Sequence, residues 1–301
     1  LGSFLLNPDL TRAELASSGG YDSVAIAPYM FNHLNDDRST EAVFGSMFAE
    51  PEMWDSRPKG LIVRHADFAR TAARPAKLSV YEINLGTTEG TATQASVNRV
   101  VPSVGAAVAL LDHTLLMLRD LGVKDQSVWQ LTGLKTPFHN TAGGDGETAP
   151  LYGTVLDMDG VTNRRRPQFL AEQLVNAAML PTMLKTEIHG ANPTWDQPLS
   201  SNDDVVMKGA HTLQSFAFAD GKRRSLIVIN LDRTRSLPLL FGGKSPSGDV
   251  TVSRLDAKNI TDTNESAENV RISTSAMKDF NPRKQFLVPP YSISVLEWTV
   301  R

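Results

Sequence analysis

The first two-thirds of the chain alternates between short apolar runs and longer segments in which apolar residues recur every three or four positions. Runs rich in β-branched and aromatic residues are typical of strands, and the periodic segments are typical of amphipathic helices. Strands followed by helices predict an α/β arrangement of parallel strands and crossover helices. The expected strands cover residues 21–29, 78–85 and 126–132, and the expected helices cover 41–48, 64–73, 100–121 and 166–184.

The pattern changes near residue 190. Beyond it the helical period disappears, and short alternating segments follow one another, separated by Gly, Asn, Asp and Pro. Such a series is typical of an antiparallel β-sandwich. We therefore predict two domains, residues 1–190 and 191–301, with 192–203 as the linker. The expected strands of the second domain cover residues 211–218, 225–231, 236–240, 250–255, 270–274, 285–288 and 292–300.

One connection, residues 133–165, is unusually long and has little regular pattern. Loops of this length usually either carry function or are flexible surface insertions. The sequence gives both interpretations equal weight.

Composition narrows the classes of function. The 301 residues include 30 Lys and Arg against 33 Asp and Glu, and this net charge of −3 argues against a basic nucleic-acid-binding protein. The sequence has no Cys, which excludes a disulfide framework, a thiolate zinc site and a cysteine nucleophile. The six His have no metal-ligand spacing, so we expect no metal site. No apolar run reaches about 20 residues, so we expect no membrane span.

Glu82 is the strongest candidate for chemistry. It lies near the end of the second expected strand, among apolar and aromatic residues and just before Asn84. Active sites of parallel α/β folds lie at the carboxyl ends of their strands, where such a side chain is accessible. The alternative is a structural carboxylate satisfied by a neighbouring Arg or by backbone donors, because an unpaired buried Glu is unfavourable.

Two aromatic residues are expected at the same edge of the sheet. Tyr29 closes the first strand, so its hydroxyl is expected to hydrogen-bond Glu82 and to keep it ionised, unless Tyr29 is an ordinary core residue. Trp129 lies in the third strand, where an indole either stacks on a sugar or packs in the core, and packing is favoured. His113, in the middle of an expected helix, is interpreted as structural.

Three motifs, taken in order, resemble the retaining glycoside hydrolases of the (β/α)8 superfamily, particularly arabinofuranosidases, xylosidases and glucuronidase-like enzymes. VYEINLG, residues 80–86, resembles the seventh barrel strand, which ends in the catalytic nucleophile. Residues 151–176 are similar to the segment that leads from strand eight into the last helix, and residues 286–298 are similar to the closing strand of the C-terminal sandwich. The resemblance implies a partial barrel with strands six to eight, followed by an antiparallel β-sandwich.

The resemblance also implies a mechanism. Glu82 matches the nucleophile of a double displacement on a carbohydrate substrate, and Tyr29, Asn84 and Trp129 are the expected substrate-binding residues. In such enzymes a second carboxyl about 5 Å away serves first as acid and then as base, and no metal or organic cofactor is needed. A role in polysaccharide degradation and an extracellular or periplasmic location are the corresponding expectations.

The second carboxyl is where the sequence departs from these families. It normally belongs to an Asn-Glu pair at the end of strand four, whereas Asn-Glu occurs here only at residues 264–265, inside the expected sandwich, where we reject it. A full barrel needs about 250 residues, and only about 190 precede the sandwich. We therefore expect this chain, which begins at Leu1 and not at Met, to be the C-terminal half of a larger enzyme. A missing N-terminal segment or a second polypeptide would complete its barrel.

Two other functions stay open. The absent second carboxyl is also compatible with a non-catalytic carbohydrate-binding or assembly protein on a degenerate barrel. A third possibility is an α/β protein of another class in which Glu82 is purely structural.

Overall fold

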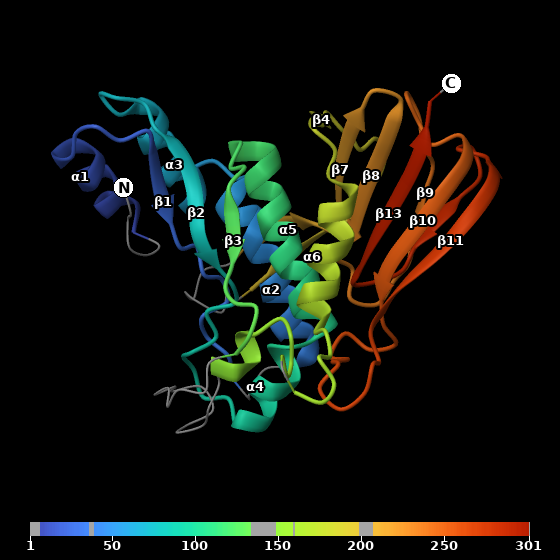
Figure 1. The fold of residues 1–301 in the computed structure, drawn as a ribbon, viewed down its shortest axis with the longest axis horizontal. Coiled ribbons are helices and arrows are strands. Elements are labelled where there is room, and N and C mark those ends of the chain that lie inside the picture. Colours follow the sequence, from blue (N-terminus) through green and yellow to red (C-terminus); the bar gives the residue numbers. More distant parts are fainter. Residues whose placement is uncertain (1–6, 36–38, 134–148, 159, 199–206, 301) are drawn as a thin grey trace. The chain divides into compact units, whose positions relative to one another are not determined.

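The computed structural model describes residues 7–35, 39–133, 149–158, 160–198 and 207–300. The chain divides into two compact units (Figure 1). The first unit comprises Leu1–Val101, Asp112–Gly153 and Asp196–Ala210, and the second comprises Pro102–Leu111, Thr154–Trp195 and His211–Arg301. The predicted domain boundary at residue 190 stays a prediction.

The first unit contains a parallel sheet whose strands lie in the order β1-β2-β3, as the alternation of strands and helices predicted. Val24 and Ile26 of β1 pair with Leu78 and Val80 of β2, and all four side chains are buried. The elements of this unit are α1 (Pro8–Ser17), β1 (Ser23–Ile26), α2 (Thr40–Asp55), α3 (Leu61–Thr71), β2 (Lys77–Ile83), α4 (Gln94–Val100), β3 (Gln126–Val128), η1 (Ala149–Tyr152) and residues 112–121 of α5 (Val104–Leu121).

Helix starts in this unit follow ordinary capping chemistry. The side chains of Asn7, Ser39 and Thr93 each accept a hydrogen bond from a backbone N–H in the first turn of α1, α2 and α4. The N-terminal helix α1, which sequence patterning did not predict, packs against α3. Of the long connection, residues 134–148 lie outside the described residues.

Two predicted helices differ from the structure at proline-containing segments. The expected helix 100–121 is interrupted, because α4 ends at Val100, Pro102 lies in the break and Ser103 caps the start of α5. The expected helix 166–184 stops at Ala178, ahead of Pro181, and Thr182–Leu184 forms strand β4 instead. No single helix in the described part of the chain is long and apolar enough to cross a membrane, although α4 and α5 would reach that length as a bent pair.

The second unit is the predicted antiparallel sandwich. Its larger sheet has the strand order β11-β10-β13-β8-β7-β4, and β12 pairs with β9 in a smaller sheet. Inward-facing apolar residues, among them Val228, Val252, Phe286 and Leu296, form the core between the sheets. The strands are β4 (Thr182–Leu184), β7 (Leu213–Asp220), β8 (Arg223–Asn230), β9 (Leu237–Leu239), β10 (Gly248–Asp256), β11 (Arg271–Phe280), β12 (Phe286–Val288) and β13 (Ser292–Thr299).

Helix α6 (Pro167–Ala178) packs against β8, β10, β11 and β13 of the larger sheet. The Ser225 hydroxyl donates a hydrogen bond to the Ala178 carbonyl at the end of this helix. Strands β5 (Thr194–Gln197) and β6 (Met207–His211) form a separate two-stranded pair, so part of the predicted linker 192–203 is a strand.

Candidate active site

The site is built in the first unit, at the carboxyl ends of the parallel strands. Tyr29 lies just beyond β1 and Glu82 lies near the end of β2, and the Tyr29 hydroxyl donates a hydrogen bond to the Glu82 carboxylate. Burial raises the pKa of Tyr29, and the negative charge of Glu82 raises it further. Tyr29 is therefore a neutral donor that holds the carboxylate in one orientation.

A β-bulge determines where Glu82 points. Val80 of β2 pairs with Gln126, and Ile83 pairs with Val128, so β2 uses one residue more than β3 over the same stretch. Both Val80 and Ile83 are buried, and Tyr81 and Glu82 between them are not. Regular alternation would have placed Glu82 on the same face as Leu78 and Val80. The extra residue interrupts this alternation at Tyr81 and Glu82, and bulges of this kind re-aim side chains beside active sites.

Three aromatic rings form a cluster that includes Tyr29, the residue that contacts Glu82. The Trp129 ring, at the end of β3, meets the Tyr29 ring edge to face with 6.4 Å between centroids, and it lies 6.0 Å from the Tyr152 ring. Trp129 is only partly buried, so it packs against the two tyrosine rings and keeps some exposed surface. This arrangement combines both interpretations of Trp129, core packing and a surface available for stacking. The Trp129–Gln130 peptide bond is cis.

Tyr152 is a member of the site that sequence analysis did not select. Its ring is buried, and its hydroxyl donates a hydrogen bond of 2.9 Å to the Thr87 carbonyl. Burial, followed by the influence of Tyr29, raises the pKa of Tyr152. The only sequence signal for it was its place near the start of the motif 151–176, within the long connection 133–165.

Asn84, one of the expected substrate-binding residues, is bonded to neighbouring backbone groups. Its side chain is 2% exposed, and its amide donates to the backbone carbonyls of Trp129 and Tyr152. Its side-chain oxygen accepts from the Leu85 N–H. These bonds to backbone groups hold Trp129 and Tyr152 in position relative to β2, and a contact between Asn84 and substrate stays a prediction.

The segments after β1 and β2 continue side by side beyond the strands. The Gly86 N–H donates to the Met30 carbonyl and the Leu34 N–H donates to the Glu89 carbonyl, at 2.5 Å and 2.9 Å. The Asn32 side-chain oxygen occupies the space beside Gly86, 1.7 Å from where an added Cβ would lie. These bonds fix the backbone on both sides of the Tyr29–Glu82 contact.

Among the other carboxylates of the first unit, the buried residues Glu50 and Glu52 are engaged in contacts of their own. Glu50 is buried and accepts from the Phe31 N–H, and Phe31 has a left-handed backbone with φ of 54°. Glu52 forms an ion pair with Arg57 at 2.5 Å. Glu41 is an exposed residue in the first turn of α2, and Glu147 lies outside the described residues.

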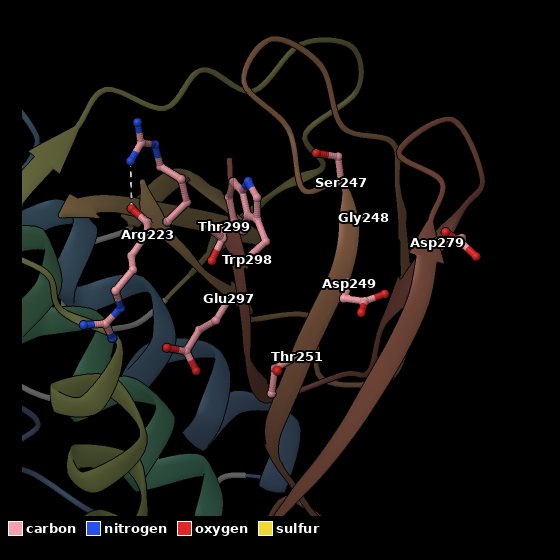
Figure 2. A pocket seen from close by; sticks show the side chains of 10 residues that line it. Arg223, Ser247, Gly248, Asp249, Thr251, Asp279, Glu297, Trp298 and Thr299 are labelled. Atoms are coloured by element: carbon pink, nitrogen blue, oxygen red, sulfur yellow. Dashed lines mark hydrogen bonds between the residues drawn. The ribbon is translucent and has the colours of Figure 1, made fainter. Parts of the chain in front are cut away.

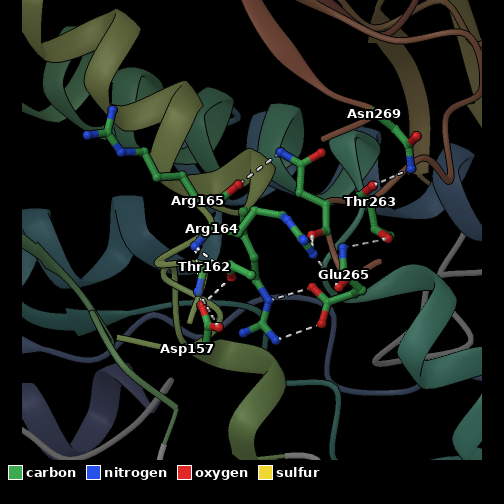
Figure 3. A network of polar contacts seen from close by, with 9 residues as sticks. Asp157, Thr162, Arg164, Arg165, Thr263, Glu265 and Asn269 are labelled. Atoms are coloured by element: carbon green, nitrogen blue, oxygen red, sulfur yellow. Dashed lines mark hydrogen bonds and ion pairs between the residues drawn. The ribbon is translucent and has the colours of Figure 1, made fainter. Parts of the chain in front are cut away.

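The rejected Asn-Glu pair is part of a structural network in the second unit. The Arg166 guanidinium donates two hydrogen bonds to the Glu265 carboxylate, of 2.7 and 2.9 Å. Figure 3 shows Glu265 within this polar network, near Thr263. Asn264 is 1% exposed, and its amide donates to the carbonyls of Arg165 and Val270. A carboxylate held by a two-pronged guanidinium is suited to bracing two loops and not to giving up a proton.

The second unit has a polar groove of its own, with a volume of about 520 Å³. It opens where β10 and β13 separate, beyond Thr251 and Glu297, the last paired residues at that end. Figure 2 shows Glu297 and Asp249 on two different strands at this opening. The polar side chains that line it include Arg223, Arg224, Asp249, Thr251, Glu297 and Thr299.

Comparison with known proteins bears out the predicted fold. No protein-family model matches this sequence, and no curated protein matches it. Solved structures do match. An α-L-arabinofuranosidase from Thermotoga maritima, crystallised with arabinose, aligns over 99% of this chain and 57% of its own, with a TM-score of 0.70 and 16% identity. The GH51 α-L-arabinofuranosidase from Thermotoga petrophila aligns over 99% and 56%, with a TM-score of 0.70 and 15% identity.

A 4-O-α-L-rhamnosyl-β-D-glucuronidase from Fusarium oxysporum aligns over 97% of this chain and 56% of its own, with a TM-score of 0.58 and 12% identity. Likeness at this level of identity establishes the fold, a partial (β/α)8 barrel followed by a β-sandwich. The chain spans a little over half the length of these three structures.

Proposed function

We propose that this chain carries the nucleophile of a retaining glycoside hydrolase, and that the nucleophile is Glu82. The observation that carries the proposal is the placement of Glu82 at a bulge near the carboxyl end of β2, hydrogen-bonded by Tyr29 and beside the partly exposed Trp129. The fold likeness to arabinofuranosidases and a glucuronidase supports this interpretation. An ionised carboxylate that is accessible and held in place is what nucleophilic attack needs.

The reaction has two displacements. In the first, a Glu82 oxygen bonds to the anomeric carbon as the bond from that carbon to the leaving oxygen breaks, and a second carboxylic acid protonates that oxygen. In the second, the same carboxyl takes a proton from water as the water oxygen bonds to the anomeric carbon and releases Glu82. Tyr29 keeps the carboxylate oriented for attack. Trp129 offers its exposed surface to the sugar, and Asn84 holds Trp129 in place.

The second carboxyl is proposed to come from outside the described residues. The sheet of the first unit has three strands, with β1 and β3 at its edges, and unpaired edges invite further strands. We infer that a further segment of the same protein or a second polypeptide pairs with these edges and supplies the acid. Carbohydrate is the proposed substrate class, and α-L-arabinofuranosides and β-D-glucuronides are the first to test, given the names of the matching enzymes.

The test uses the protein with a C-terminal tag, isolated from its source so that whatever completes the barrel stays with it. We expect hydrolysis of one of these aryl glycosides and a loss of at least about a thousandfold in kcat in Glu82→Gln. The matched control is Glu268→Gln, which alters an exposed ion pair with Arg271 in the second unit and should leave kcat unchanged. Full activity in Glu82→Gln would exclude the proposal.

A carbohydrate-binding protein without catalysis is the second candidate. It is favoured by the lack of a free second carboxyl among the candidates in the described residues, and by the polar groove between β10 and β13. This candidate predicts oligosaccharide binding without turnover, unaffected by Glu82→Gln and weakened by Glu297→Gln. Calorimetric titration of both variants separates the two functions.

A further inference from the structure

We propose that Tyr81 contacts the substrate, with its phenol hydroxyl donating a hydrogen bond to an oxygen of the sugar bound at Glu82. This inference deepens the proposed function and rests on it. Tyr81 was not among the residues that the sequence pattern selected, and the feature that singles it out is the bulge in β2.

The bulge places Tyr81 and Glu82 on the same face of the sheet. Both lie between Val80 and Ile83, whose partners in β3 are separated by the single residue Ser127. Two residues of the bulged strand therefore stand opposite one residue of its neighbour, on the face away from the buried side chains. Tyr81 is 39% exposed, which is unusual for a tyrosine within a strand of a parallel sheet.

The two phenols near Glu82 differ in what their hydroxyls do. The Tyr29 hydroxyl is already engaged with Glu82. Within the part of the chain that the structure describes, the Tyr81 hydroxyl makes no hydrogen bond. Burial and, after it, the charge of Glu82 raise the pKa of Tyr81, so this phenol keeps its proton and acts as a donor. Tyr81 thus adds an available donor within electrostatic range of the nucleophile.

A sugar has the chemical groups that a partly exposed phenol such as Tyr81 can bind. A sugar ring presents hydroxyl oxygens around its edge and C–H groups on its faces, and a half-exposed tyrosine offers a donor on an apolar ring. Ligand sites typically combine apolar walls with a few well-placed polar groups. The competing explanation is that Tyr81 only packs inside the completed barrel, in which case its hydroxyl would have no substrate partner.

The experiment combines Tyr81→Phe with substrates that each lack one hydroxyl, using the tagged protein isolated from its source. Tyr81→Phe keeps the ring and removes only the donor. We expect kcat/KM for the complete sugar to fall about tenfold to a hundredfold. For the one deoxy-sugar that lacks the contacted hydroxyl, wild type and variant should be equal. Tyr291→Phe is the matched control, since its hydroxyl binds the Lys258 carbonyl in the second unit, and it should behave as wild type.

Two results would overturn the inference. Tyr81→Phe could stay within twofold of wild type on every substrate, or it could lose the same factor on every deoxy-sugar, which is the behaviour of a packing residue. Thermal melting of Tyr81→Phe, compared with wild type, checks that the variant is folded. Failure of the proposed function looks different, because wild type itself would then hydrolyse none of the substrates.

Discussion

The Tyr29 hydroxyl donates a hydrogen bond to the Glu82 carboxylate, and this single contact joins the ends of two parallel strands at the proposed nucleophile. Glu82 lies on a bulge where β2 is locally out of register with β3. The regular pairing of β2 with β3 is interrupted there, so the contact with Tyr29 is needed to hold the carboxylate. The neighbouring backbone is tied down by bonds between residues 30–34 and 84–92. Orientation of this kind lowers the cost of reaching the reactive geometry.

Removal of the Tyr29 hydroxyl should therefore impair chemistry more than binding. In Tyr29→Phe the ring contact with Trp129 is kept, and the donor to Glu82 is lost. We expect kcat to fall about tenfold to a hundredfold with little change in KM. Tyr21→Phe is the control, because its hydroxyl binds the Leu15 carbonyl, and kcat should not change. Equal kcat values for Tyr29→Phe and wild type would argue against the orienting role.

Asn84 should be needed for stability as well as for the position of Trp129. Asn84→Ala leaves the buried carbonyls of Trp129 and Tyr152 without the donor that they share. We expect the free energy of unfolding to fall by about 2–4 kcal/mol, measured by urea denaturation. Asn98→Ala, at an exposed position of α4, should change it by less than about 0.5 kcal/mol. A similarly small effect of Asn84→Ala would show that Asn84 does not hold these segments together.

The paired segments beyond β1 and β2 leave no room for a side chain at Gly90. Its φ is +109°, and an added Cβ would lie 2.1 Å from the Leu34 carbonyl oxygen. We expect Gly90→Ala to lower the free energy of unfolding by at least about 2 kcal/mol. In Gly19→Ala, where nothing lies within 4 Å of the added carbon, stability should be nearly unchanged. Equal melting temperatures for the two variants would show that these segments do have room for a side chain at Gly90.

His65 should make the protein sensitive to mild acid. Burial, with a smaller effect of Arg64, lowers the pKa of His65 from 6.5 to about 4, and its Nδ1 atom lies 2.8 Å from the Thr11 hydroxyl oxygen. The unfolded chain binds a proton at this residue below pH 6.5 and the folded chain does not, so stability is lost as the pH falls from 6.5 towards 4. The loss reaches about 3 kcal/mol at pH 4.

The measurement is urea denaturation of wild type and His65→Gln between pH 7 and pH 4. Gln at position 65 is neutral throughout this range. Wild type should therefore lose more of its free energy of unfolding than His65→Gln does as the pH falls. Parallel curves over the whole range would contradict a depressed pKa at His65.

Sequence patterns predicted the parallel strands, the sandwich and the position of Glu82, because each depends on local periodicity and strand order. The bulge at Tyr81 and Glu82 was not predictable, since one extra residue shows only in the register against β3. The place of Tyr152 in the site and the burial of the Asn84 side chain could not be predicted either, because both depend on contacts between segments far apart in the chain. The pairing of Arg166 with Glu265 is also long-range, although the rejection of Glu265 as a proton donor agrees with it.

Trapping of the glycosyl-enzyme is the sharpest test of whether Glu82 is the nucleophile. The tagged protein is incubated with an activated 2-deoxy-2-fluoro glycoside of the substrate class that it hydrolyses, digested with a protease and mapped by mass spectrometry. We expect one sugar adduct per chain, on Glu82, and none in Glu82→Gln. An adduct on a different residue, with Glu82 unmodified in a protein that has lost its activity, would contradict this assignment.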